Sequence, residues 1–414
     1  MNARTGSPPS ALAVCLHGRR IGVITRLAGD RHIFAFEEDH VDDPGRPTLS
    51  LAFKSASGGL VTEIRGYRVR VPPFFSNLLP EGHLRSYLAA RIGVKPEREF
   101  LLLHALGADL PGAVTVASMD AEAPARNDRR PREASDDGSA RAPLRFSLAG
   151  VQLKFSAVME AAGGLTVPAD GIGGSWIVKL PSARFPAVPQ NEFVTMELAR
   201  RIGIPVPRTR LVPVHEIVGL PDDVAAVSDH ALAVERFDRG PGGSRIHMED
   251  FAQVFGLYPE RKYGRRSCAG IASVLSAEAG AEAVEDFVRR LAFSVLTGNA
   301  DMHLKNWSLV YADGVTPSLS PAYDLLSTIP YLPNDQFALT FGGTKDIHGI
   351  TREQIRRFAD KAGLAVGPLW RVVQETVDAT VEAWRRHDAK AMLPDDIRTS
   401  LDRHLISAAG RTRG

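Results

Sequence analysis

Asp301 and Asn306 are the two residues whose types and spacing most directly suggest chemistry. They stand five positions apart in the polar run 297–306, TGNADMHLKN. A carboxylate can orient an attacking hydroxyl group, and an amide oxygen five residues later can hold Mg²⁺, which is the division of labour in a kinase catalytic loop. Both residue types also favour turns through local hydrogen bonds, so the pair could instead be purely structural.

The elements on either side of this run favour the chemical interpretation. Before it, the apolar residues of 286–296 recur at helical intervals, and Gly298 predicts the end of that helix. After it, residues 307–319 predict a β-hairpin around the turn 312–314. Asp324 follows and would be the second Mg²⁺ ligand of a kinase C-lobe. It could instead cap a helix beginning at Leu325.

Composition and length bound the class of protein. The chain has 414 residues, of which 44% are hydrophobic and 24% charged, which is typical of a globular protein with two or three domains. A net charge of +2 gives no strong expectation of nucleic-acid binding. Only Cys15 and Cys268 are cysteines, which argues against a disulfide framework and fits a reducing compartment. The apolar run 11–16 is too short to be a membrane span, so we expect a cytoplasmic protein.

The first 118 residues predict a small domain, β-rich and then helical. Strands are expected at 12–16, 21–24 and 32–36, helices at 83–93 and 98–106, and a short strand at 112–116. The following run 119–143 contains no aromatic or β-branched residue, so it cannot bury enough apolar surface to offset its ordering entropy. We expect a flexible charged linker there, although its charges could serve a partner.

Residues 144–240 predict a nucleotide-binding part. Lys179 lies in the apolar strand 176–180, from which a kinase lysine reaches the ATP phosphates, although a lone strand lysine is commonly a solvated or edge residue. The next helix is expected to open at Asn191 as its N-cap. Glu192 or Glu197 of that helix could pair with Lys179, while Glu192 could also simply suit the helix dipole.

A further strand at 231–234 leads into Glu235, Arg236 and Phe237, the place in the order where a two-lobed kinase holds adenine between its lobes. Phe237 could instead belong to a core, and Asp238 could form a surface pair with its neighbouring arginines. Residues 241–414 predict a mainly helical lobe that carries the catalytic and metal-binding loops.

Taken together, the chain resembles the HipA-type serine/threonine kinases, the toxins of bacterial toxin–antitoxin modules. The resemblance rests on segments that occur in the family's order, namely 74–82 (FFSNLLPEG), 147–154 (SLAGVQLK), 177–181 (IVKLP), 191–192 (NE), 235–239 (ERFDR), 299–306 and 323–324 (YD). It implies an α+β fold with two protein-kinase-like lobes, a mixed β N-terminal lobe with a small β-rich subdomain, and a mainly helical C-terminal lobe.

The resemblance also implies a role for each matching residue. Asp301 would be catalytic, and Asn306 and Asp324 would bind Mg²⁺. ATP would be bound by a phosphate loop and by side chains around it, namely Ala149, Gly150, Val151, Gln152, Leu153, Lys154, Lys179, Glu235, Arg236, Phe237, His303, Lys305, Asn306, Tyr323 and Asp324. Ser147 matches a serine that is autophosphorylated, which switches the kinase off because a dianion there would repel the nucleotide phosphates.

Family membership implies partners as well. Known members phosphorylate proteins such as aminoacyl-tRNA synthetases, and a helix-turn-helix antitoxin, HipB-like, neutralises them and mediates any contact with DNA. Two alternatives stay open. The catalytic run also resembles that of phosphatidylinositol kinases, although no basic amphipathic membrane-binding stretch accompanies it. The second alternative is a catalytically silent corepressor. The presence of the complete set of site residues argues against it, namely Asp301, Asn306, Asp324 and Lys179.

Overall fold

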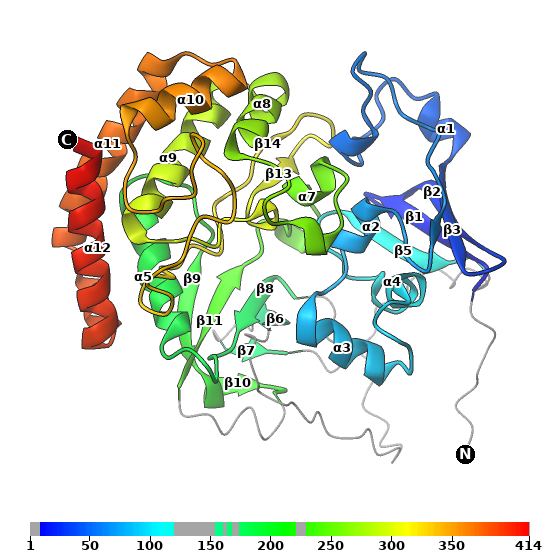
Figure 1. The fold of residues 1–414 in the computed structure, drawn as a ribbon. Helices are drawn as coiled ribbons and strands as arrows, with labels where there is room; N and C mark the ends of the chain where they lie inside the picture. The colour runs from blue at the N-terminus through cyan, green and yellow to red at the C-terminus, as the bar shows by residue number, and fades with distance from the viewer. Residues whose placement is uncertain (1–8, 120–153, 160–163, 168–173, 221–228, 414) are drawn as a thin grey trace.

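Three sheets form in the part of the chain that the computed structural model describes, which is residues 9–119, 154–159, 164–167, 174–220 and 229–413 (Figure 1). Each sheet belongs to a different part of the chain. The first lies in the N-terminal unit, the second in the middle segment, and the third beside the helices of the C-terminal lobe.

The N-terminal unit is an antiparallel sheet covered on one face by helices. Its strand order is β4-β3-β2-β1-β5, from β1 (Ala11–Leu16), β2 (Arg19–Leu27), β3 (Arg31–Phe36), β4 (Tyr67–Arg68) and β5 (Val114–Ser118). Its helices are α1 (Glu38–Val41), η1 (Leu51–Phe53), α2 (Pro73–Asn77), α3 (Gly82–Arg91) and α4 (Glu99–Leu106). Alternate residues of β1 are buried, which confirms the predicted strand.

The middle sheet has the order β10-β7-β6-β8-β11-β9. Its strands are β6 (Lys154–Met159), β7 (Leu165–Thr166), β8 (Trp176–Lys179), β9 (Thr209–Pro213), β10 (Ile217–Val218) and β11 (His230–Glu235). Helix α5 (Val188–Arg201) packs on β9 and β11. In the antiparallel register of β6 and β8, Lys154 stands opposite Lys179, so both side chains project from the same face.

The C-terminal lobe is built around α9 (Ala281–Thr297), whose residues from Phe287 onward are nearly all buried. Around it pack α8 (Cys268–Glu278), α11 (Val366–Arg385) and α12 (Asp395–Arg413), with α10 (Arg352–Ala362) lying on α8 and α11 (Figure 1). A small sheet of β12 (His247–Asp250), β13 (Ser308–Tyr311) and β14 (Ser318–Leu319) contains the predicted hairpin. Shorter helices are η2 (Val214–Glu216), η3 (Pro241–Gly243), α7 (Phe251–Val254), η4 (Pro259–Arg261), η5 (Leu304–Asn306) and η6 (Asp388–Met392).

The N-terminal unit is fastened to the C-terminal lobe by buried polar contacts. Glu249 of β12 accepts hydrogen bonds from the Ser50 hydroxyl at 2.5 Å and the Leu51 N–H at 2.9 Å. Gln253 donates to the Phe74 carbonyl at 3.0 Å, and Asn77 donates to the Leu257 carbonyl at 2.8 Å. Because buried polar groups are satisfied only by aligned partners, these contacts fix the relative position of the two units.

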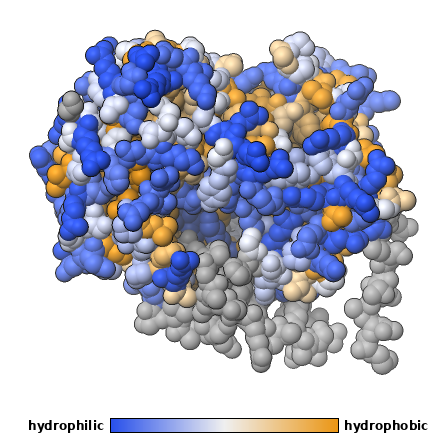
Figure 2. Space-filling view, viewed as in Figure 1, coloured by the Kyte–Doolittle hydropathy of each residue, from blue (hydrophilic) through white to orange (hydrophobic). Residues whose placement is uncertain are grey.

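Hydrophilic residues make up most of the molecular face shown in Figure 2. Among the described residues, no helix is both long enough and apolar enough to cross a membrane.

One predicted helix start is wrong. Helix α5 begins at Val188, with Pro189 in its first turn and Ala187 before it in a left-handed conformation (φ 51°). Asn191 is therefore an interior helix residue and not an N-cap. Its buried amide instead donates to the Ser327 carbonyl at 2.9 Å and accepts from the Ser327 N–H at 3.1 Å, which ties α5 to the segment after Asp324.

Candidate active site

Helix α9 delivers the polar run 299–306 to the site. The helix ends at Gly298, which is left-handed (φ 68°), as the sequence predicts. A Cβ atom at this position would lie 2.4 Å from the Ile329 side chain, so glycine is required both by the backbone and by the close approach. The chain then turns sharply into the loop that holds Asp301.

Asn299 links the two acidic residues of the site. Its side-chain oxygen accepts from the Asp301 N–H at 3.2 Å, and its Nδ2 lies 3.4 Å from the Asp324 carbonyl oxygen. Asn306 closes the same loop, because its Nδ2 donates to the Asp301 carbonyl at 2.6 Å. The structure therefore brings Asp301, Asn306 and Asp324 to one place.

Asp301 is an exposed residue of this site. The Tyr263 hydroxyl donates to it at 3.1 Å. Partial desolvation by the surrounding protein raises the pKa of Asp301 above its ordinary value, and the Tyr263 hydrogen bond opposes that rise. A carboxylate with a raised pKa is better suited to accept a proton from a hydroxyl group.

Lys179 and Lys154 both contact Asp324. Lys179 is buried and also pairs with Glu192 of α5, while Lys154 Nζ lies 3.2 Å from Asp324 Oδ2. Glu197 instead pairs with Arg200, so Glu192 is the partner of Lys179. Burial opposes ionisation of Asp324, but the two ammonium groups hold its pKa far below the ordinary value. Lys179 is therefore neither a solvated nor an edge residue.

Asp324 does not cap a helix, which makes that alternative wrong. Residues 321–328 have no helical structure, and Asp324 itself is left-handed (φ 53°). This conformation is uncommon outside glycine and is most accessible to asparagine and aspartate. It turns the carboxylate toward the lysines of β6 and β8.

The donors present suit a magnesium ion. Mg²⁺ takes oxygen ligands at one or two protein groups and keeps water and phosphate oxygens for the rest. Asp324 offers a carboxylate. Asn306 directs Nδ2 to a carbonyl, and in that assignment its Oδ1 is the amide atom left to bind a metal. These two side chains fit the ion that the sequence predicts.

Other predicted nucleotide residues make contacts of their own. His303 is buried, and burial together with the nearby Lys262 ammonium lowers its pKa to about 3. The ring centroids of Tyr323 and Phe237 lie 5.6 Å apart. The Tyr323 hydroxyl donates to the Lys305 carbonyl at 2.8 Å. Tyr323 directly precedes Asp324 in the chain, and its ring brings Phe237 from the segment after β11 to this part of the site.

Lys305 contacts the N-terminal unit and the end of β12. Its Nζ donates to the Asn77 carbonyl at 2.9 Å and lies 3.1 Å from Asp250 and 3.3 Å from Glu81. Although burial opposes the charge, Asp250 and Glu81 raise the pKa of Lys305. Lys305 thus anchors the loop 299–306, and sequence analysis did not connect it with Asn77 or Glu81.

The segment after β11 is pinned at several points. Glu235 pairs with Arg208, with oxygen–nitrogen distances of 2.5 and 2.6 Å. The Arg236 N–H donates to the Ser175 carbonyl at 2.8 Å, and its guanidinium is buried. Asp238 pairs with its neighbours Arg236 and Arg239, but it is buried, at 4% exposure, so the interpretation of this pairing as a surface one is wrong.

Some predicted residues lie outside the described part of the chain. They are Ser147, the loop residues Ala149 to Leu153, and all of the predicted linker 119–143 except Met119. Tyr263 is a site residue that sequence analysis missed. It stands 38 positions before Asp301, and nothing in its own segment marks it as an Asp301 partner.

The fold and this site define a two-lobed, protein-kinase-like α+β protein with an added N-terminal unit. Residues 12–117 match the family described as HipA N-terminal domain, and residues 146–384 match HipA-like C-terminal domain. The chain therefore belongs to the HipA family.

Individual relatives agree with this assignment. A Sinorhizobium fredii protein named "Putative kinase" is 48% identical over 399 residues, covering 95% of this chain and 96% of the relative. The serine/threonine-protein kinase toxin HipA of Shewanella oneidensis is 29% identical over 330 residues, covering 71% and 72%. A chain from the solved complex of HipA, HipB and operator DNA of Shewanella oneidensis superposes with a TM-score of 0.73 at 25% identity, covering 97% and 96%.

Proposed function

We propose that this chain is a serine/threonine protein kinase that uses ATP and Mg²⁺. The observation that carries the proposal is that Lys179, Asp301, Asn306 and Asp324, which come from three separate segments, meet at one place. Lys179 pairs with Asp324, Asn299 links Asp324 to Asp301, and Asn306 donates to the Asp301 carbonyl. Such a set supplies the positioning and electrostatic stabilisation on which phosphoryl transfer depends.

Each side chain has a distinct task in this proposal. The hydroxyl of a target serine or threonine donates a hydrogen bond to Asp301, and its oxygen attacks the γ-phosphorus of ATP. The bond to the ADP oxygen breaks, and the hydroxyl proton passes to Asp301. Bound Mg²⁺ would neutralise phosphate charge, held by Asn306 and Asp324. Lys154 and Lys179, which face each other across β6 and β8, would meet the phosphate oxygens.

The two lysines explain why an anion belongs at this place. Like charges directly opposite on neighbouring strands destabilise a sheet. Here Asp324 and Glu192 compensate them. When the phosphates and magnesium bind, Asp324 would exchange its lysine contacts for the metal, and the lysines would take phosphate oxygens instead.

We further propose the biological setting from the relatives. The chain would act in the cytoplasm as the toxin of a toxin–antitoxin pair and would bind a HipB-like helix-turn-helix antitoxin, through which it would reach DNA. Its target would be a translation-related protein such as an aminoacyl-tRNA synthetase, and phosphorylation of Ser147 would switch it off. The N-terminal unit, linker, nucleotide-binding part and helical lobe predicted from the sequence would be its domains.

Transfer of label from ATP tests the proposal. The purified chain is incubated with labelled ATP and Mg²⁺, alone and with cell extract, beside Asp301→Asn. We expect label on Ser147 and on an extract protein, both reduced by about 10²- to 10⁴-fold in the variant. Label in lipid would instead indicate a lipid kinase, and no label in any fraction would indicate the silent corepressor. Co-purification with the co-expressed helix-turn-helix protein tests the partner separately.

A further inference from the structure

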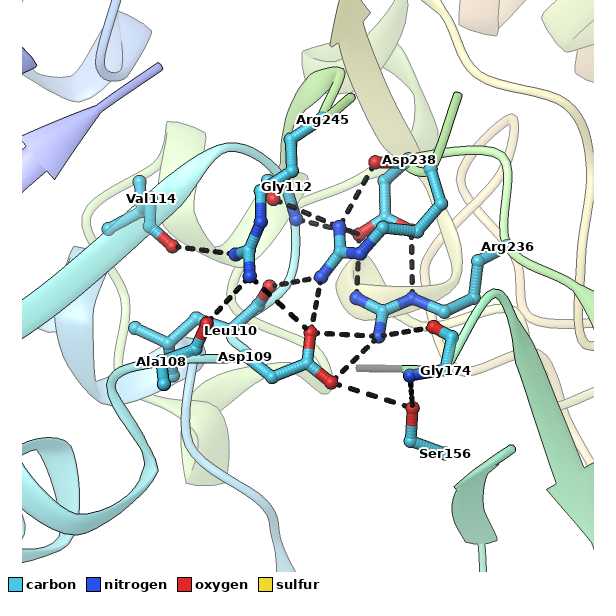
Figure 3. A network of polar contacts seen from close by, with 11 residues as sticks. Ala108, Asp109, Leu110, Gly112, Val114, Ser156, Gly174, Arg236, Asp238 and Arg245 are labelled. Carbon is cyan, nitrogen blue, oxygen red and sulfur yellow. Dashed lines mark hydrogen bonds and ion pairs between the residues drawn. The ribbon is translucent and has the colours of Figure 1, made fainter. Parts of the chain in front are cut away.

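A buried cluster of charged side chains lies beside the segment that follows β11 (Figure 3). It consists of Asp109, Arg236, Asp238 and Arg239, with Arg245 at its edge. The first four side chains are 5 to 9% exposed, and Arg245 is 24% exposed. Asp109 comes from the loop between α4 and β5, so the cluster connects the N-terminal unit with the segment joining the two lobes.

Asp109 is the point at which the cluster's partners converge. Its carboxylate accepts from Arg239 Nη2 at 2.7 Å and from Arg236 Nη1 at 3.3 and 3.4 Å. Arg245 Nη2 lies 3.8 Å away. The Ser156 hydroxyl, from β6, donates to the other side of the carboxylate at 3.5 Å.

A second set of contacts fastens the same segment to the loop 109–112. Asp238 receives a two-pronged contact from Arg236 at 2.9 and 3.0 Å, and it accepts from the Gly112 N–H at 2.8 Å. Arg239 donates to the carbonyls of Leu110 and Gly112 at 2.9 and 3.0 Å. Bidentate arginine–carboxylate contacts fix the relative orientation of the two side chains as well as their distance.

The cluster also reaches the strand that carries Lys179. The Gly174 N–H donates to the Ser156 hydroxyl at 3.1 Å, and the Gly174 carbonyl lies 3.5 Å from Arg236 Nη1. A Cβ atom at Gly174 would lie 2.3 Å from the Ala157 carbonyl oxygen, so this backbone is held tightly against β6. Residue 174 leads directly into β8, two positions before its first residue.

We propose that Asp109 is a positioning residue for the nucleotide. It fixes the segment on both sides of Phe237 through its contacts with Arg236 and Arg239, and it fixes the start of β8 through Ser156, which accepts from the Gly174 N–H. The N-terminal unit is also bound to the C-terminal lobe at Glu249, Gln253 and Asn77. It can therefore fix the segment between the lobes through Asp109 without being part of either lobe. This inference rests on the proposed function, since it assumes that ATP binds beside Phe237 and Lys179.

The test is ATP binding by the full chain, measured by titration calorimetry with Mg²⁺. Asp109→Asn keeps the shape of the side chain but removes the charge that balances the arginines. We expect its dissociation constant for ATP to rise about tenfold, within the range usual for coupled sites. Ser156→Ala, which leaves every charge in place, should shift the constant in the same direction by less. Asp43→Asn is the control, because Asp43 pairs with exposed Arg19 in the same unit.

The outcomes separate positioning from folding. A purely structural role for Asp109 would lower the fraction of protein able to bind, and therefore the stoichiometry, while the dissociation constant stayed the same. That result would overturn the inference. If Asp109→Asn does not fold, an unchanged dissociation constant for ATP in Ser156→Ala would overturn it instead. A wild-type chain that binds no ATP would overturn the proposed function itself, together with this inference.

Discussion

At the scale of single residues, Asp301 and Tyr263 form the contact closest to the proposed chemistry. Tyr263 donates to the carboxylate that would receive the proton of the target hydroxyl. Its hydrogen bond stabilises the charged form of Asp301 and lowers its pKa, while partial desolvation by the surrounding protein raises that pKa. If Asp301 is the base as proposed, the hydroxyl of Tyr263 sets in part the pH at which it can act.

We predict that Tyr263→Phe moves the acid limb of activity to higher pH. Catalysis needs ionised Asp301, so kcat/KM falls as pH drops through its pKa, which lies above the ordinary 3.8 in the wild-type chain. Loss of the hydroxyl raises that pKa further. The measurement is a pH profile of kcat/KM. Tyr331→Phe, which alters contacts to Asn191 and Pro186, is the control and should leave the limb in place. A limb that moves downward would contradict this assignment.

At the scale of elements, two junctions fix the position of the loop 299–306, which carries Asp301. One is the end of α9 at Gly298, and the other is the contact of Lys305 with Asn77 at the end of α2 and with Glu81, which directly precedes α3. The first could be predicted, because helical periodicity and a terminal glycine are local signals. The second could not, because Asn77 and Lys305 are 228 positions apart and no local pattern relates them.

Gly298→Ala should lower the free energy of unfolding by about 1 to 3 kcal/mol, because a left-handed alanine is strained and its methyl group would meet Ile329. Gly363→Ala is a matched control. Gly363 ends α10 with a similar φ of 70°, but its Cβ would meet nothing within 4 Å. Denaturant unfolding of both variants measures the difference. Equal losses would mean that the contact with Ile329 contributes nothing.

Glu81→Gln should lower kcat roughly three- to tenfold and leave the KM for ATP unchanged, because a loosened loop misplaces Asp301 without altering the nucleotide contacts. Glu81 holds Lys305 at 3.3 Å and Lys262 at 2.9 Å. Glu260→Gln serves as the control, since Glu260 pairs with Arg70 across the same interface but is 61% exposed. Steady-state kinetics of both variants provide the test, and an equal fall in kcat would argue against a specific role for Glu81.

Sequence patterns failed at the elements where distant parts of the chain decide the structure. Asn191 has the residue type of an N-cap, but α5 already begins at Val188 and Pro189. The Asn191 side chain instead donates to the Ser327 carbonyl, 136 positions away. Asp324 precedes two leucines as a cap would, yet the lysines of β6 and β8 hold it in a left-handed turn. Lys179, Asp301 and Asp324 were predicted as site residues because each lies in a segment with a recognisable local pattern. The order of the helices and strands was predicted from local patterns in the same way.

At the scale of the whole molecule, Glu249 makes the junction of the two units depend on pH. It is fully buried and accepts from Ser50, Leu51 and Tyr311, the last at 2.5 Å. Burial is the main cause that raises its pKa to about 7 from an ordinary 4.5. The folded state therefore holds this proton more tightly than the unfolded state.

The sign of the pH effect follows from this difference. Between pH 4.5 and 7 the folded chain binds more protons at Glu249, so the free energy of unfolding falls as pH rises, by up to about 3 kcal/mol. Glu249→Gln should remove this share of the pH dependence. Denaturant unfolding at pH 5 and pH 8 measures the change in the free energy of unfolding for the wild type and for Glu249→Gln. The difference between the two changes isolates Glu249, because the histidines contribute equally to both proteins. Identical pH dependence would show that Glu249 does not titrate in this range.

The most direct test of the account is whether magnesium and ATP bind together at Asp324 and Lys179. Titration calorimetry is performed with Mg²⁺ and with a chelator. In the wild-type chain Mg²⁺ should tighten ATP binding. Asp324→Asn should remove that dependence, Lys179→Gln should weaken binding under both conditions, and Asp301→Asn should bind ATP as the wild type does. If Asp324→Asn keeps the full magnesium dependence, the central claim is contradicted.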